Sequence, residues 1–332
     1  MNPELHRLFQ RRLLVVAGKG GVGKTTVACI LALLAAQLGK RTLLAEVDGA
    51  GRAAKLLGVE PGPVGEPRAV QPSLSVMSVE GSNALAEYLA IILPVKRVLQ
   101  AVFASRIYQY FVAAAPGLKE LLTIGKIWYE AERLDPGTGR RLWDLVIMDA
   151  PATGHSLQYL RMPRAARDAF GAGLVGRESQ RLVELLVDPQ RTAVNLVTTA
   201  EEMPVNETLE MYQQIRGDLQ MPLGLLFVNR VHRAPFTVAE VKRAQARIDK
   251  SRTADERLLL AEVLERAREE VGWSDIHQTY LRRLRADISM PALELPFVFA
   301  EEFGLEQVRA LAAELGGEVG SVVRRGGRGR AG

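Results

Sequence analysis

The chain has 332 residues, is 48% hydrophobic and 24% charged, and carries a formal net charge of +5. This composition is ordinary for a globular protein and allows one large α/β domain, and four arginines near the end of the sequence (Arg324, Arg325, Arg328 and Arg330) supply most of the net charge. The remaining body is nearly neutral, which predicts no nucleic-acid binding by the fold, and the single cysteine, Cys29, excludes an internal disulfide or a cysteine cluster.

Short apolar runs bounded by turn residues alternate with longer helical patterns along the chain. Runs without polar alternation are typical of parallel strands that helices cover on both faces. The alternation predicts an α/β fold, a doubly wound and mostly parallel sheet of about seven to eight strands. The predicted strands are Leu13–Ala17, Thr42–Val47, Leu74–Val79, Leu145–Asp149, Val194–Thr198, Leu225–Asn229 and Ala292–Leu295.

Two helical insertions interrupt this alternation. The first, at about 80–140, is rich in aromatic residues and contains helical patterns at Ala84–Leu93, Val98–Val112 and Leu118–Arg133. The second, Val238–Asp287, is charged, and we expect its charges to face solvent. No apolar stretch reaches the length of about 18 residues that a membrane helix needs. We therefore predict a single domain over residues 1–318 and a disordered Gly/Arg-rich tail over 319–332, in a cytoplasmic protein without a transmembrane segment.

Residues 18–25, Gly-Lys-Gly-Gly-Val-Gly-Lys-Thr, fit the phosphate-loop pattern G-x-x-x-x-G-K-[ST] between a predicted strand and a predicted helix, Thr26–Leu38. Glycines let successive backbone N–H groups turn toward phosphate oxygens, and the helix N-terminus adds partial positive charge. Lys24 is expected to reach the β and γ phosphates, and the Thr25 hydroxyl to bind Mg²⁺. The sequence therefore predicts a site for ATP and Mg²⁺ formed by Gly20, Gly21, Val22, Gly23, Lys24, Thr25 and Thr26.

Acidic residues end two of the predicted strands. Asp149 closes the strand Leu145–Asp149, and a carboxylate at a strand end beside a phosphate loop can hold Mg²⁺ directly or through water. Asp48 follows the strand Thr42–Val47, and Glu46 lies two residues deeper on the same strand face. We expect Glu46 to support the metal site from outside its ligand shell or to have a structural role.

Two segments carry a family resemblance. Lys19, directly after the first glycine, resembles the extra lysine in the deviant phosphate loop of the family that contains MinD, ParA, the nitrogenase iron protein and the arsenite-transport ATPase. Residues 149–155, Asp-Ala-Pro-Ala-Thr-Gly-His, are similar to the Asp-Thr-Ala-Pro-Thr-Gly-His switch of the arsenite-transport (ArsA) and tail-anchored-protein-targeting (guided entry) ATPases, although positions 150–152 differ. The chain thus looks like a single-P-loop ArsA-like ATPase, and the resemblance covers about Leu13 to Leu315.

The resemblance implies roles for individual residues. Lys19 would reach the nucleotide of a facing subunit, and Asp48 would orient the attacking water, which makes Lys19, Lys24 and Asp48 the implied catalytic set. The implied switch consists of Asp149, Thr153, Gly154 and His155. The residues implied to line the adenine are Asn229, whose amide can both donate and accept, with Pro296 and Phe297.

The chain also departs from the family. Val241 and Ala244 replace the two cysteines that bind zinc in the eukaryotic targeting ATPase, which predicts no zinc site. A lone cysteine likewise predicts no iron–sulfur cluster and disfavours an arsenite-pump role. One phosphate loop implies a second polypeptide, so the expected partner is an identical chain or a related ATPase subunit.

Three functions remain open at this level, and the first two are the main competitors. In the first, ATP closes and opens a Mg²⁺-dependent dimeric ATPase that acts on a protein or hydrophobic client, with the segment Ala84–Arg133 as either a client groove or part of the core and interface. In the second, the chain is a MinD- or ParA-like scaffold on a membrane or polymer. The last predicted helix, Leu305–Leu315, has no basic amphipathic face, which favours the first. A nucleotide-binding module without turnover is the third alternative.

Overall fold

The computed structural model describes residues 2–81, 117–151, 155–171, 173–234, 236–248 and 254–317. The predicted helices Ala84–Leu93 and Val98–Val112, the switch residues Thr153 and Gly154, and the Gly/Arg-rich tail lie outside these residues. The described strands are β1 (Leu13–Gly18), β2 (Thr42–Val47), β3 (Arg68–Gln71), β4 (Leu74–Val79), β5 (Leu145–Asp149), β6 (Thr192–Thr199), β7 (Leu223–Val231) and β8 (Ala292–Pro296).

The strands form one eight-stranded sheet in the order β3-β4-β2-β5-β1-β6-β7-β8. All neighbouring pairs are parallel except β3 with β4 at one edge. The predicted doubly wound sheet is therefore confirmed, and all seven predicted strands are present. The eighth strand, β3, has no counterpart in the sequence prediction, because its four residues are exposed or half-buried and lack an apolar run.

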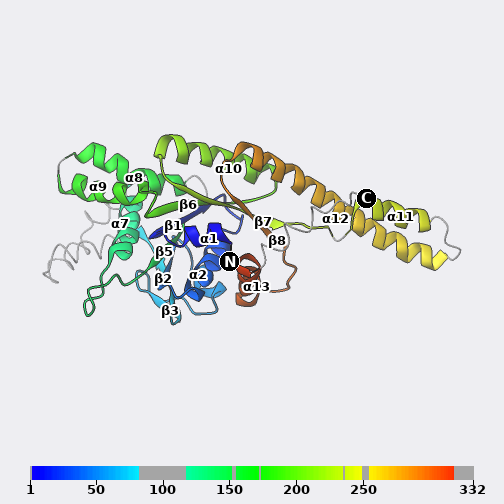
Figure 1. Cartoon of the computed structure of the whole chain (residues 1–332), viewed down its shortest axis with the longest axis horizontal. Coiled ribbons are helices and arrows are strands. Elements are labelled where there is room, and N and C mark those ends of the chain that lie inside the picture. The colour runs from blue at the N-terminus through cyan, green and yellow to red at the C-terminus, as the bar shows by residue number, and fades with distance from the viewer. Residues whose placement is uncertain are drawn as a thin grey trace, which may run out of the picture.

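Helices cover both faces of the sheet (Figure 1). The described helices are α1 (Pro3–Leu8), α2 (Lys24–Gln37), α3 (Arg52–Leu56), α7 (Leu118–Glu132), α8 (His155–Phe170), α9 (Leu174–Val187), α10 (Glu202–Gln214), the π-helical turn η1 (Ile215–Leu219), α11 (Val238–Ile248), α12 (Ala254–Asp287) and α13 (Leu305–Gly317). One face of the sheet packs against α2, and α1, α3 and α13 lie on the same side. The opposite face packs against α7, α9, α10 and α12, and α8 lies across α7 and α9.

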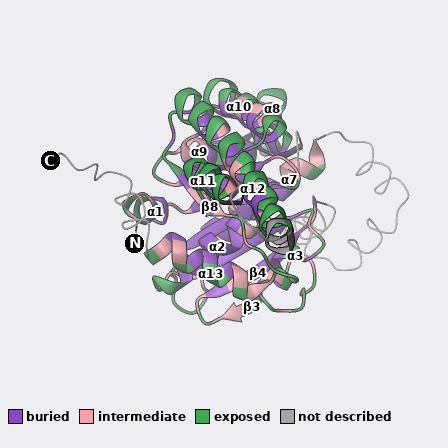
Figure 2. Cartoon of the chain, turned by 90° about the vertical axis from the view of Figure 1, so that its right-hand side faces the viewer, coloured by how far each residue is buried: buried purple, intermediate pink, exposed green. Residues whose placement is uncertain are grey.

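The central strand β1 shows why this layering is stable. Its side chains alternate, so that Leu13 and Val15 join the apolar cluster under α7–α10 while Leu14 and Val16 join the cluster under α2 and α13. Every residue of β1 is buried, which explains the continuous apolar run in the sequence. Figure 2 shows the buried sheet and α2 inside a layer of helices whose outer surfaces are exposed.

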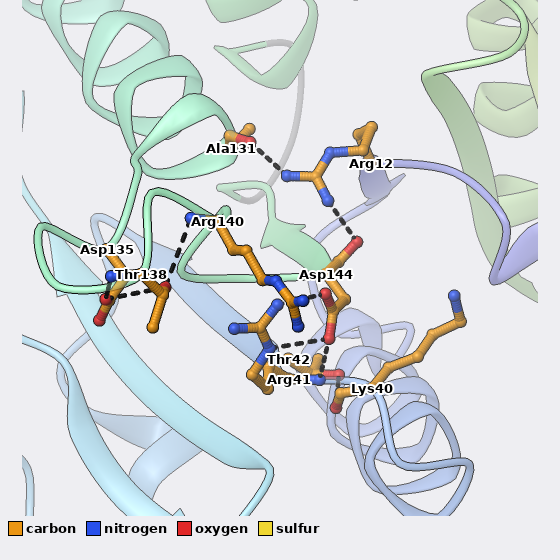
Figure 3. Close-up of polar contacts among 9 residues, drawn as sticks. All are labelled: Arg12, Lys40, Arg41, Thr42, Ala131, Asp135, Thr138, Arg140 and Asp144. Carbon is orange, nitrogen blue, oxygen red and sulfur yellow. Dashed lines mark hydrogen bonds and ion pairs between the residues drawn. The ribbon is translucent and has the colours of Figure 1, made fainter.

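Two arginines, Arg12 and Arg41, connect neighbouring elements at the N-terminal edge of the sheet. Arg12 precedes β1 and donates from Nη1 to the Asp144 carbonyl at 2.7 Å and from Nη2 to the Ala131 carbonyl at 2.5 Å. Arg41 binds the Asp144 carboxylate, with Nη2 to Oδ1 at 2.7 Å (Figure 3). These contacts tie β1, β2, α7 and β5 together at the edge opposite the phosphate loop.

The second insertion is helical, as predicted. Helix α12 has 34 residues and, with α11, extends away from the sheet (Figure 1). The two helices share a small apolar cluster that includes Val241 and Leu264. Of the predicted charge run, Glu262, Glu265, Arg266, Arg268 and Glu269 are exposed. Among the described residues, no helix is both long enough and apolar enough to cross a membrane.

Candidate functional site

The phosphate loop joins β1 to α2 at the carboxyl edge of the sheet. Gly21 and Gly23 adopt left-handed backbone angles, with φ of 85° and 92°. A Cβ at Gly23 would also lie 2.2 Å from Asn229 Nδ2, so both the backbone and the neighbouring side chain require glycine there. Helix α2 begins at Lys24, two residues earlier than the predicted Thr26, and this places Lys24 and Thr25 in its first turn.

The two predicted site residues of that first turn, Lys24 and Thr25, form hydrogen bonds with different partners. Lys24 is buried, and its Nζ donates to the Lys19 carbonyl of the same loop at 3.0 Å. Burial lowers the pKa of Lys24, and Asp149 partly opposes that shift. The Thr25 hydroxyl donates to Asp149 Oδ2 at 2.6 Å. The loop therefore presents an ammonium and a carboxylate-bound hydroxyl next to the helix N-terminus, where anions are stabilised.

Two buried carboxylates lie side by side behind Thr25. Strands β2 and β5 pair in a register that sets Glu46 opposite Asp149. Burial raises the pKa of Asp149 to about 7, the Thr25 hydroxyl lowers it, and the Glu46 carboxylate raises it further. Burial also raises the pKa of Glu46, whose Oε1 accepts the Arg52 backbone N–H at 3.0 Å.

One oxygen of each carboxylate lacks a hydrogen-bond partner, which fits a site for a bound cation. Asp149 Oδ1 and Glu46 Oε2 are buried and have no hydrogen-bond partner. Orphaned buried carboxylate oxygens are costly unless a cation or water satisfies them, and Mg²⁺ prefers oxygen ligands and keeps several waters. No group of three or more His, Cys, Asp or Glu residues that could hold a metal is present in the described part of the chain. The fit to Mg²⁺ therefore depends on Thr25, Asp149 and water, with Glu46 behind them.

Asp48 lies just beyond β2 in an unusual backbone conformation. Its φ is 50°, in the left-handed region that non-glycine residues rarely adopt. Its backbone N–H donates to the Val79 carbonyl at 3.0 Å, and its Oδ2 accepts a hydrogen bond from the Tyr159 hydroxyl of α8. Asp48 itself is exposed, whereas Tyr159 is buried. Tyr159 was not predicted, because it lies 111 residues away along the chain and belongs to no motif.

Lys19 points away from its own phosphate loop. Its Nζ lies 2.5 Å from Glu207 Oε1 on α10, and both side chains are partly exposed. Thus the two loop lysines differ: Lys24 is buried against the loop, and Lys19 is at the surface in an ion pair. Glu207 was also missed from the sequence, since helix α10 gives no local sign that it faces residue 19.

The three residues predicted to line adenine lie at the ends of β7 and β8. Asn229 is buried in β7, and its Nδ2 donates to the Val22 carbonyl at 2.9 Å, so its amide also supports the phosphate loop. Pro296 ends β8, and the Phe297 backbone N–H donates to the Val231 carbonyl at 3.1 Å. The Phe297 ring stacks on His232 with a centroid distance of 4.6 Å. The sheet therefore brings the loop and Asn229 into contact, and Phe297 packs against His232, which directly follows β7.

The implied switch is only partly visible. Asp149 ends β5, and the backbone N–H of Ala150 donates to the Val16 carbonyl at 3.0 Å. Thr153 and Gly154 lie outside the described residues, and so does the side chain of His155, although α8 begins at His155. The structure therefore places the two ends of this segment, the Asp149 carboxylate and the first residue of α8.

A parallel sheet with a phosphate loop after β1, and a carboxylate at the end of neighbouring β5, defines a P-loop nucleotide-binding protein. Residues 11–173 match the family model described as anion-transporting ATPase. ATPase BagA of Mycobacterium tuberculosis is 32% identical over 310 residues, which cover 88% of this chain and 89% of that protein. ATPase GET3 of Kluyveromyces lactis is 26% identical over 284 residues, 74% of this chain and 81% of the relative.

An arsenical pump-driving ATPase of Escherichia coli is 28% identical over 224 residues, 61% of this chain but only 36% of that longer protein. The chain belongs to the anion-transporting (ArsA-type) ATPase family, as the resemblance predicted, and it is an ATPase.

Proposed function

We propose that the chain is one subunit of a Mg²⁺-dependent dimeric ATPase, paired with an identical chain or a related ATPase subunit, and that ATP-driven closure of the dimer completes the catalytic site. The observation that carries this proposal is the orientation of Lys19. Its ammonium lies at the surface in an ion pair with Glu207, while Lys24 occupies the loop. A cation that joins the nucleotide only on closure stabilises charge that develops at the γ-phosphate in the transition state.

In this proposal each site residue has a chemical role. Backbone N–H groups of residues 20–26 hold the phosphates, Lys24 neutralises their charge, and Thr25 and Asp149 hold Mg²⁺. Mg²⁺ held by these two residues would supply positive charge next to the phosphates. Asp48 positions the water that attacks the γ-phosphate. Asn229, Pro296 and Phe297 line the adenine, and the segment from Asp149 through Thr153 and Gly154 to His155 changes conformation with the nucleotide.

The closing dimer acts on a protein or hydrophobic client or partner. An arsenite-pump role is disfavoured, because Cys29 is the only cysteine of the chain and is fully buried. Burial raises the pKa of the Cys29 thiol well above its ordinary value, which suppresses the thiolate that a metalloid would need. A free buried thiol suits the reducing cytoplasm. We also assign residues 1–318 to one ATPase domain and residues 319–332 to a tail outside it.

The test combines two substitutions. Asp48→Asn should retain ATP binding and lose steady-state turnover, whereas Lys19→Ala should retain ATP binding by the single subunit and lose turnover in the dimer. Turnover at the wild-type rate in Lys19→Ala would remove the cross-subunit role. Mass measurement in solution with ATP, compared with ADP, reports the closed dimer directly.

Client coupling has a separate test. Asp48→Asn, held in the ATP state, should co-purify with a client, and recovery of empty dimers alone would remove that part of the proposal. Binding to liposomes in ATP but not in ADP would favour the MinD- or ParA-like scaffold instead, and ATP binding with no turnover in the wild-type chain would favour a simple nucleotide-binding module.

A further inference from the structure

A buried phenol contacts the exposed carboxylate that the proposed function assigns to water positioning. The Tyr159 hydroxyl donates to Asp48 Oδ2. The Tyr159 ring is 4% exposed and packs in the same apolar cluster as Val47, the last residue of β2. Burial, reinforced by the Asp48 carboxylate, raises the pKa of Tyr159 well above its ordinary value. The phenol therefore keeps its proton and remains a donor to Asp48 throughout the neutral range.

The backbone of Asp48 makes this contact informative. A φ of 50° is unfavourable for a residue with a Cβ, so the surroundings must hold the residue in place. Two contacts do so: the Asp48 N–H bond to the Val79 carbonyl at 3.0 Å, and the Tyr159 bond to the side chain. The Tyr159 hydroxyl donates to Oδ2 and not to Oδ1, so the phenol can orient the carboxylate while the other oxygen remains able to accept a hydrogen bond from water.

The position of Tyr159 links this carboxylate to the switch. Tyr159 lies one turn into α8, which begins at His155, shortly after Asp149 ends β5. Helix α8 is therefore the direct continuation of the segment that connects the Mg²⁺-facing carboxylate to the rest of the protein. A single hydrogen bond thus joins the tip of β2, which carries Asp48, to the helix that follows the switch.

We propose that Tyr159 is a positioning residue for ATP hydrolysis. Its hydroxyl orients the Asp48 carboxylate, and because Tyr159 belongs to α8, that orientation depends on the position of α8. This inference rests on the proposed role of Asp48. It explains why the hydroxyl of a buried tyrosine in a mostly apolar cluster meets an exposed acid that water alone could solvate. Because Asp48 is exposed, water replaces the phenol when it is removed, so the loss concerns orientation rather than stability.

The experiment compares the wild-type chain with Tyr159→Phe, which keeps the ring and removes only the hydroxyl. We expect kcat to fall three- to tenfold, the order of effect of losing one typical hydrogen bond in a place that water can reach, while the Kd for ATP changes less than twofold. The thermal midpoint should stay close to the wild-type value. Tyr129→Phe on α7 is the matched control, because it makes the same chemical change at a half-exposed ring, and its kcat should not change.

A double-mutant cycle separates positioning from a general structural effect. In single-turnover measurements, Tyr159→Phe should slow the wild-type chain but have no further effect in Asp48→Asn, because the phenol acts through that carboxylate. A wild-type or higher kcat in Tyr159→Phe, or an equal slowing in both backgrounds, would overturn the assignment. If Asp48→Asn itself turns over normally, the proposed role of Asp48 fails; if it loses turnover and Tyr159→Phe does not, only the present inference fails.

Discussion

The ion pair between Lys19 and Glu207 leads to a quantitative prediction about dimer closure. In the described chain Lys19 Nζ lies 2.5 Å from Glu207 Oε1, and the two side chains are 24% and 37% exposed. If Lys19 must reach the nucleotide of a facing subunit, this pair has to break first. Glu207→Gln removes the charge but keeps the size of the side chain, so it lowers the cost of releasing Lys19.

The exposure of the pair sets the size of the effect. Exposed ion pairs contribute about 0.5–1 kcal/mol, because water and salt screen the attraction and ordering two long side chains costs entropy. Such an energy corresponds to a factor of about two to five in an equilibrium constant at 25 °C. We therefore expect the protein concentration that gives half-maximal specific ATPase activity to fall about two- to fivefold in Glu207→Gln if one pair breaks per dimer, and by the square of that factor in a homodimer, where two pairs break. The difference should shrink in high salt.

The assay measures ATP turnover against chain concentration at saturating ATP and Mg²⁺. Glu210→Gln is the matched control, since it makes the same change at an exposed position on the same helix, and its midpoint should equal that of the wild type. An unchanged midpoint in Glu207→Gln would mean that the pair does not restrain Lys19. A higher midpoint would mean that Glu207 aims Lys19 at its target, and either result would refute the reasoning.

Two further predictions concern stability. Arg12→Ala removes two hydrogen bonds, to the carbonyls of Ala131 and Asp144, and should lower the free energy of unfolding by about 2–3 kcal/mol in urea titration. The control, neighbouring Arg11→Ala, should change the free energy of unfolding by less than about 0.5 kcal/mol. Equal losses in the two variants would contradict a stabilising role for the Arg12 hydrogen bonds. Burial raises the pKa of Asp149 from an ordinary value near 3.8 to about 7, so between pH 4 and 7 the folded chain binds a proton more tightly than the unfolded chain, and stability falls as pH rises. Asp149→Asn lacks this titrating group. The thermal midpoint of the variant minus that of the wild type, both measured without nucleotide or Mg²⁺, should therefore increase from pH 5 to pH 7.5. A difference that stays constant with pH would contradict the raised pKa.

The phosphate loop and the buried strands could be predicted from the sequence because their determinants are local. Gly21, Gly23, Lys24 and Thr25 act through backbone angles and side chains within a few residues of one another. Parallel strands under helices need largely apolar runs, so seven of the eight strands in the described residues could be predicted from such runs. Strand β3 was not, because an exposed edge strand needs no apolar run and is defined only by its pairing with β4.

The groups that contact the site residues could not be predicted from the sequence. The motif around Asp149 predicted a metal-binding carboxylate, but its raised pKa follows first from burial inside the sheet and then from the register of β2 and β5, which sets Glu46 beside it. Asn229 was expected near the nucleotide, yet its bond to the Val22 carbonyl depends on the order of the strands around β1.

The sequence by itself determined the class of the protein, the phosphate loop and the residues at the strand ends, since each depends on spacing along the chain. Only the tertiary structure decided what those residues touch. Lys19 meets Glu207 across 188 residues of sequence, and Asp48 meets Tyr159 across 111. Neither Glu207 nor Tyr159 differs locally from any other residue on a helix. Their roles arise because the packing of α10 and α8 against the sheet brings them to the site, and packing depends on contacts that no short motif encodes.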